Sequence, residues 1–176
     1  MFNTIRPYRF VQRNRNFTGG RESWSFEDIY KFFIHSPDSQ RKYLVEVHAY
    51  TDHLYTVDFY AKVLDVNRYL LHTNQYAAGK LGATVLDVIA RIIGHDSRPC
   101  FGFIAAAMPD ETSDESTKRF NLYTRMLELK VDARRRYITI NPEDSSLFML
   151  LKALAANQSL KQDIIERYES VFRETF

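Results

Sequence analysis

The stretch that decides the fold is Tyr43–Val63, which reads YLVEVHAYTDHLYTVDFYAKV. Its first part, residues 43–50, is mostly apolar and rich in β-formers, as expected of a strand. Turn-forming residues occupy 51–53, and residues 54–63 then alternate apolar with polar side chains. A period of two with one polar face predicts an antiparallel hairpin, with the turn at 51–53.

The flanking segments supply the other elements. Upstream, Ser25 precedes apolar residues at helical spacing, which predicts a helix over 25–35 that ends at 36–39. Downstream, the pattern predicts a third strand over 68–73, a helix over 77–93 closed by Gly94, a strand over 100–107, a helix over 116–130, a strand over 137–140 and an amphipathic helix over 158–176. Residues 141–152 stay open, because Asn141-Pro142 suits a helix start whereas residues 146–152 suit a buried strand equally well.

This order predicts an α+β fold, a mixed sheet in which an antiparallel hairpin feeds a βαβα unit, with a C-terminal helix added. We expect a parallel, right-handed crossover between the strand at 68–73 and the strand at 100–107. The chain divides into a basic, aromatic N-terminal arm (1–22), an α+β domain (23–152) and a C-terminal amphipathic helix (153–176). That helix packs on the same domain or on a partner.

Composition and length narrow the class of protein. With 176 residues, 45% of them hydrophobic, the chain suits a single globular domain. One cysteine excludes an internal disulfide and a cysteine-based zinc cluster. The start of the chain lacks the apolar core of a signal peptide. The longest apolar run, Cys100–Met108, is far shorter than the roughly 20 residues of a membrane helix. We therefore expect a cytoplasmic protein.

Basic and aromatic residues gather in the N-terminal arm. Arg6, Arg9, Arg13 and Arg15 are interleaved with aromatic side chains, and no acidic residue precedes Glu22. This pattern suits an arm that packs its aromatic rings and solvates its arginines. The alternative is an arm that tracks the phosphates of a nucleic acid or binds an acidic partner.

The element order over 23–152 resembles that of the GNAT superfamily of N-acetyltransferases. Residues 74–83 (NQYAAGKLGA) lie between a predicted strand and a predicted helix, where the family carries Q/R-x-x-G-x-G/A. Counted from Gln75, that motif would place glycine at 78 and glycine or alanine at 80, but this chain has Ala78 and Lys80. The resemblance implies acetyl-CoA as cofactor, held by Thr73, Gln75, Ala78, Gly79, Lys80, Gly82 and Thr84.

Two residues are candidates for the catalytic steps of acyl transfer. Residues 120–123 (FNLY) lie where the later helix of the family often carries a Leu-Tyr pair, which implies that Tyr123 protonates the leaving thiolate. Glu46 interrupts an apolar strand, and a carboxylate there suits a general base; Asp58 on the same hairpin is the alternative. A metal site of Glu46, His48 and His72 is not expected, because no metal-binding motif is present.

The chain also resembles a looser group of uncharacterised phage and bacterial proteins. The shared features are Thr73-Asn74, Thr84-Val85, a hydrophobic strand at 101–106, and Arg119 with Tyr123. The GNAT resemblance implies an acetyl-CoA-dependent N-acyltransferase of unknown acceptor. The alternative is a non-catalytic GNAT-like binding or adaptor protein of a phage or mobile element, located in the cytoplasm of the infected cell. Such a protein would use its basic arm and last helix to bind protein or nucleic acid.

Overall fold

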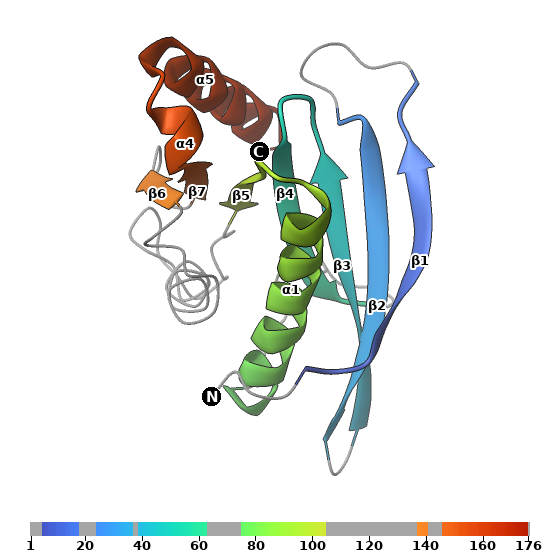
Figure 1. Cartoon of the computed structure of the whole chain (residues 1–176). Coiled ribbons are helices and arrows are strands. Elements are labelled where there is room, and N and C mark those ends of the chain that lie inside the picture. Colours follow the sequence, from blue (N-terminus) through green and yellow to red (C-terminus); the bar gives the residue numbers. More distant parts are fainter. Residues whose placement is uncertain are drawn as a thin grey trace.

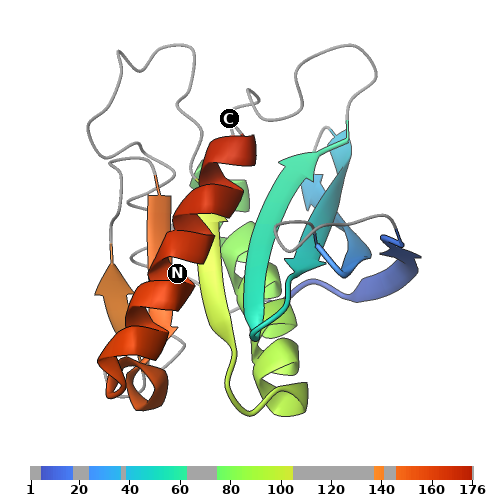
Figure 2. The same cartoon turned by 90° about the horizontal axis from the view of Figure 1, so that it is seen from above.

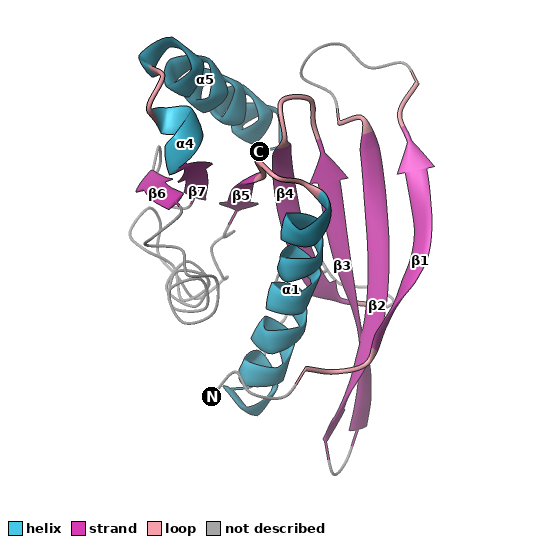
Figure 3. Cartoon of the chain, in the orientation of Figure 1, coloured by secondary structure: helices cyan, strands magenta, loops and turns pink. Residues whose placement is uncertain are grey.

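A computed structural model describes residues 5–17, 24–36, 39–62, 75–104, 137–140 and 146–175. Within these residues the protein is an α+β fold built on one seven-stranded mixed sheet of order β1-β2-β3-β4-β5-β7-β6 (Figures 1 and 3). The strands are β1 (Tyr8–Arg15), β2 (Phe26–Ser36), β3 (Ser39–Ala49), β4 (Leu54–Ala61), β5 (Cys100–Ile104), β6 (Tyr137–Ile140) and β7 (Ser146–Leu151). The helices are α1 (Gln75–His95), α4 (Lys152–Ala155) and α5 (Gln158–Thr175).

Strands β1 to β4 form an antiparallel meander. The predicted hairpin is confirmed as β3 and β4, which pair from Tyr43–Ala61 to Ala49–Tyr55. The turn between them holds Asp52 and His53 at φ values of 61° and 63°. This left-handed backbone matches the twist of the flanking strands, and Asp and His tolerate it better than most residues.

The parallel connection joins β4 to β5 through α1. Their ladder contains only three pairs, Leu54–Cys100, Tyr55–Phe101 and Thr56–Gly102. Beyond it β4 continues beside β3 to Ala61, and β5 continues beside β7 to Ile104. Figure 2 shows the two strands diverging after the paired segment. The structure thus has a parallel connection, but the partner predicted for the strand at 100–107 is wrong, because β5 lies between β4 and β7. Residues 68–73 lie outside the described residues.

The main core lies between α1 and one face of the sheet. Apolar residues at helical spacing on α1 are fully or almost fully buried, as the sequence stripe predicts. They pack with alternate residues of β2, β3 and β4. The principal members are Tyr30, Phe32, Ile34, Tyr43, Val45, Val47, Val57, Phe59, Leu81, Val85, Val88 and Ile89.

Helix α5 packs on the opposite face of the sheet, in front of β5 (Figure 2). Its stripe of Ile164, Tyr168 and Val171 is buried. A Cβ placed on Gly102 would lie 2.3 Å from Cε2 of Tyr168, so the glycine is what lets the helix come this close. The Tyr168 hydroxyl donates to the carbonyl oxygen of Phe103 at 3.4 Å. The C-terminal helix predicted at 158–176 is confirmed, and it packs on its own domain.

The helix predicted over 25–35 is wrong, because this segment is strand β2. Its apolar residues fit a helical spacing, but the buried positions alternate: Asp28, Tyr30, Phe32 and Ile34 are 6%, 6%, 1% and 4% exposed. Because an aspartate is not expected on a buried face, Asp28 hides the alternation of buried and exposed positions that marks a strand. It is buried because Arg13 binds both of its carboxylate oxygens, at 2.6 and 2.7 Å.

Other boundaries also shift. Residues 8–15, predicted as part of a separate arm, form β1 at the edge of the sheet. Helix α1 starts at Gln75 and runs past Gly94 to His95. The strand predicted over 137–140 is confirmed, and the strand interpretation of 146–152 holds for 146–151. The strand predicted at 100–107 is present over 100–104. The predicted helix at 116–130 lies outside the described residues.

Candidate functional site

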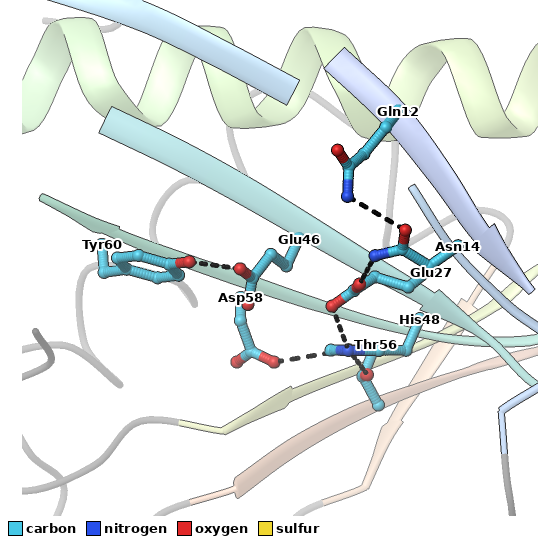
Figure 4. A network of polar contacts seen from close by, with 8 residues as sticks. All are labelled: Gln12, Asn14, Glu27, Glu46, His48, Thr56, Asp58 and Tyr60. Atoms are coloured by element: carbon cyan, nitrogen blue, oxygen red, sulfur yellow. Dashed lines mark hydrogen bonds and ion pairs between the residues drawn. The ribbon is translucent and has the colours of Figure 1, made fainter. Parts of the chain in front are cut away.

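A row of polar side chains crosses the sheet on the face opposite α1 (Figure 4). Its members alternate with the core residues of the same strands, so they point to the other side. We call this set the polar row, and it comprises Gln12, Asn14, Glu27, Glu46, His48, Thr56, Asp58 and Tyr60. It spans β1 to β4, and three of its members, Glu46, His48 and Asp58, are residues that the sequence analysis considered.

His48 lies at the centre of the polar row. Its Nε2 lies 3.1 Å from Oε1 of Glu27, and Oε2 of Glu27 accepts a bond of 2.6 Å from the Asn14 amide. On the other side of the ring, Nδ1 lies 3.5 Å from Oγ1 of Thr56 and 4.0 Å from Oδ2 of Asp58. The imidazole thus connects Glu27 of β2 to Thr56 and Asp58 of β4 across the row.

Glu46 forms the second half of the polar row. The Tyr60 hydroxyl donates to Oε1 of Glu46, and the two residues are 7% and 6% exposed. Register places Asp58 directly across from Glu46 on the neighbouring strand. Two carboxylates thus lie on one face, one held by a tyrosine and the other beside an imidazole. Such a set can accept, hold and pass protons.

The position of the hairpin turn determines which residues of β3 and β4 face each other in the polar row. With Asp52 and His53 at the turn, Glu46 pairs with Asp58 and His48 pairs with Thr56. A slip of one residue would send either partner of each pair to the core face. On β2, Glu27 pairs with His48 and completes the row.

The segment expected to bind the cofactor lies within α1 from Gln75 onward, not in a loop before it. Backbone N–H groups remain available to an anion only in the first turn of a helix. Gly79 and Gly82 are buried beyond that turn, so their N–H groups belong to the helical ladder. Thr84 is fully buried, and its hydroxyl accepts from the Arg6 backbone N–H and donates to the Lys80 carbonyl oxygen. Of this segment, only Gln75–Ala78 belong to the first turn of α1.

Two predicted site residues, Thr73 and Tyr123, lie outside the described residues. The same is true of His72, so the set of Glu46, His48 and His72 is not assembled by the described part of the chain. Within that part no group of three or more metal-ligating side chains is present. Glu46 and Asp58, in contrast, lie on adjacent strands as the hairpin predicts.

The four arginines of the predicted arm do not share one face. Arg13 is bound to Asp28 on the α1 side, and its guanidinium carbon lies 3.9 Å from the centre of the Phe26 ring. Arg9 pairs with Lys31 in register and so points to the face of the polar row. Arg15 is exposed and Arg6 is half-buried. A continuous phosphate-binding stripe of these residues is therefore not formed.

The sequence analysis did not single out the other members of the polar row, Gln12, Asn14, Glu27, Thr56 and Tyr60. Glu27 lies in the segment predicted as a helix, which removed it from the sheet altogether. Tyr60 lies in the alternating run at 54–63, on its polar side, and is nevertheless only 6% exposed. The signal was present in the hairpin register, since Tyr60 and Glu46 are two positions apart on paired strands.

Comparison of the chain with protein-family models, with curated proteins and with solved structures gives no match. Among the described helices, none is both long and apolar enough to cross a membrane.

Proposed function

We propose that the protein is an acetyl-CoA-dependent N-acyltransferase that handles its acceptor amine on the polar row. The observation that carries the proposal is the parallel β4–β5 pair, which ends after three residue pairs. The strands diverge toward the end of the sheet where α1 begins (Figures 1 and 2). A crossover helix that starts beside two diverging strands is the arrangement that the GNAT resemblance implies for a cofactor site.

The residues that would hold the cofactor are those of the first turn of α1 together with Lys80. The backbone N–H groups at the start of a helix and the Lys80 ammonium group suit a pyrophosphate. Acetyl-CoA would supply the acetyl group as an activated thioester. The buried Gly79, Gly82 and Thr84 take no direct part in this assignment.

The polar row supplies the proton chemistry of the acceptor. An ammonium group must lose a proton before its nitrogen can attack a thioester carbonyl carbon. Glu46 is the proposed base, and the hydrogen bond from Tyr60 fixes the carboxylate that takes this proton. Asp58, opposite Glu46, attracts a cationic amine electrostatically. Tyr123 remains the proposed acid for the thiolate.

Calorimetric titration with acetyl-CoA tests the cofactor part of the proposal. We expect micromolar binding that Lys80→Glu abolishes. The matched control is Lys161→Glu on α5, which makes the same change of charge on another helix and leaves binding intact. Absence of binding at millimolar acetyl-CoA, or equal loss in both variants, refutes the proposal.

Thiol release in a screen of amine acceptors tests the catalytic part. We expect Glu46→Gln to lower kcat about 10²- to 10⁴-fold, the usual contribution of a general base, and to leave the affinity for acetyl-CoA unchanged. The only tryptophan of the chain, Trp24, has its ring 5.9 Å from that of His48. Its fluorescence therefore reports an amine that reaches the polar row. An unchanged kcat in Glu46→Gln removes this residue as the base.

A second candidate, a non-catalytic binding protein, is favoured by the exposed edge strand β1. Phe10 and Val11 are 48% and 44% exposed, and β1 ends the sheet. An extended segment of a partner protein can pair with such an edge. Co-precipitation that Val11→Pro abolishes, in a protein that binds no acetyl-CoA, would support this function over the first.

A further inference from the structure

A separate cavity lies between the carboxyl end of α1 and the outer strands of the sheet. Its volume is about 800 Å³, and it opens on the α1 side, away from the polar row. It is lined by Phe10, Arg13, Phe26, Asp28, Tyr30, Val47, His53, Tyr55, Arg91, Ile92, His95, Asp96 and Ser97. None of these residues belongs to the proposed acyl-transfer site.

Aromatic rings make up much of the wall. Phe10 and Tyr30 contact edge to face, with centroids 5.7 Å apart. Phe26 has one face covered by the guanidinium of Arg13 at 3.9 Å. Tyr55 closes the wall beside the hairpin turn. Rings and a planar guanidinium favour a flat ligand, which can stack on them.

The acids of the cavity already have their hydrogen bonds. Both oxygens of Asp28 accept from Arg13. Asp96 accepts from His53 Nδ1 at 2.8 Å, from the Tyr55 hydroxyl at 2.8 Å and from the Arg98 backbone N–H at 2.9 Å. Burial acts to raise the pKa of Asp96, but these three donors outweigh it, and the net shift is downward.

Arginine and histidine side chains also line the cavity. Arg13 spends two of its N–H groups on Asp28, whereas a guanidinium has five. Arg91 and His95 bring further N–H groups from the last turns of α1. Arg91 also hydrogen-bonds Tyr8, but each guanidinium has five N–H groups, so both arginines can donate to a ligand as well. An anion accepts such bonds best.

The hairpin turn places His53 at the cavity in an unusual conformation. Its φ of 63° follows the φ of 61° at Asp52, so two consecutive residues other than glycine are left-handed. Such backbone is uncommon and persists where surrounding contacts hold it. Arg98 can only donate, and its Nη2 lies 3.1 Å from His53 Nε2. Asp96 on one ring nitrogen and Arg98 on the other hold His53 as a fixed polar corner of the cavity.

From these observations we infer that the cavity binds a small, flat organic anion, with the aromatic rings holding its planar body and Arg91 its negative group. The inference does not rest on the proposed acyltransferase activity. It assigns a second site, on the face of the sheet opposite the polar row and at the carboxyl end of α1.

Calorimetry with two probes of the same ring system tests the inference. 2-Naphthoate carries the negative charge, and 2-naphthamide is its neutral analogue. We expect naphthoate to bind at least tenfold more tightly, with NMR shifts at the His53 and Tyr55 rings. Arg91→Gln should weaken naphthoate about tenfold, the scale of one charge-assisted hydrogen bond, and leave naphthamide unaffected.

Matched variants identify the site. Arg9→Gln makes the same change on the polar-row face and should leave naphthoate binding intact, as should Lys80→Glu. The inference is overturned if naphthoate does not bind at millimolar concentration or binds no better than naphthamide. It also fails if Arg9→Gln weakens binding as much as Arg91→Gln, or if the His53 and Tyr55 resonances do not move.

Discussion

Gly102 is the position where one added methyl group should cost the most. A Cβ there would lie 2.3, 2.9 and 3.3 Å from three ring carbons of Tyr168. That ring is 0% exposed and is held by its hydroxyl on the Phe103 carbonyl oxygen, so it cannot swing aside. Overpacking of this kind costs about 1–3 kcal/mol. We expect Gly102→Ala to lose about 2 kcal/mol, or about 4–8 °C in Tm for a chain of this size.

The same substitution at Gly94 is the control. A Cβ at Gly94 meets nothing within 4 Å, and the residue lies in α1 without a positive φ. Gly94→Ala should therefore stabilise the protein by up to about 1 kcal/mol, since alanine is the better helix former. The same substitution of glycine by alanine is thus expected to lower the stability at position 102 and to raise it at position 94.

Urea unfolding of both variants measures these differences. A shift of the midpoint at constant slope reports stability alone. In a Tyr168→Leu background the ring is gone, so Gly102→Ala should cost much less, and the double-mutant cycle should show strong coupling. The reasoning is refuted if Gly102→Ala is neutral, or if its cost is the same with and without the Tyr168 ring.

Three further predictions concern titration and reactivity. Burial and the hydrogen bond to Asp87 raise the pKa of Tyr8 from 10.0 to about 12, so its contribution to stability is complete below pH 10 and is lost as the pH rises to 12. Alkaline unfolding curves should show a smaller loss in Tyr8→Phe, and an equal loss contradicts the assignment. The lowered pKa of Asp96 gives stability that is complete above the unfolded value, 3.8, and is lost as the pH falls through the folded value. In Asp96→Asn, the urea midpoint should fall less between pH 5 and pH 3 than in the unmodified protein. An equal fall in both proteins would contradict this role of Asp96. Burial raises the pKa of Cys100 to about 11, so Ellman's reagent at pH 8 should modify it only as the protein unfolds, and rapid modification of the native protein would disprove this.

The sequence predicts a strand best where the buried positions carry apolar residues and the exposed positions carry polar ones. The hairpin at 43–63 alternates cleanly, and both strands and their register were predictable from it. The segment at 25–35 was not, because Asp28 sits on a buried face that only a partner from β1, Arg13, makes tolerable. Recognising β2 therefore required knowing that residues 8–15 pair beside it, and a pattern within the segment does not contain this information.

Part of the candidate site could likewise be predicted from the sequence, and part could not. Glu46 and Asp58 were predictable, because the turn at 51–53 sets their register. Glu27 and His48 meet through a pairing between β2 and β3, which depended on the missed strand. Arg91, His53 and Asp96 come from a helix end, a turn and a connection. Only the tertiary fold brings these three residues together, so no spacing in the sequence predicts the cavity.

The short parallel ladder also has a consequence for the order of folding. Strands β1 to β4 are joined by hairpins, so each pairs with its neighbour through local contacts, and β2 and β3 alone share eleven pairs. Strand β5 joins β4 by three pairs, and only after the chain from 62 to 99 has closed on itself. Loop closure must be complete before these few bonds can form. The meander is therefore expected to collapse first, and β5 with α5 to dock last. In the native protein, the amide hydrogens of the β4–β5 ladder should then exchange with solvent through local opening of lower free energy than those of β2 and β3.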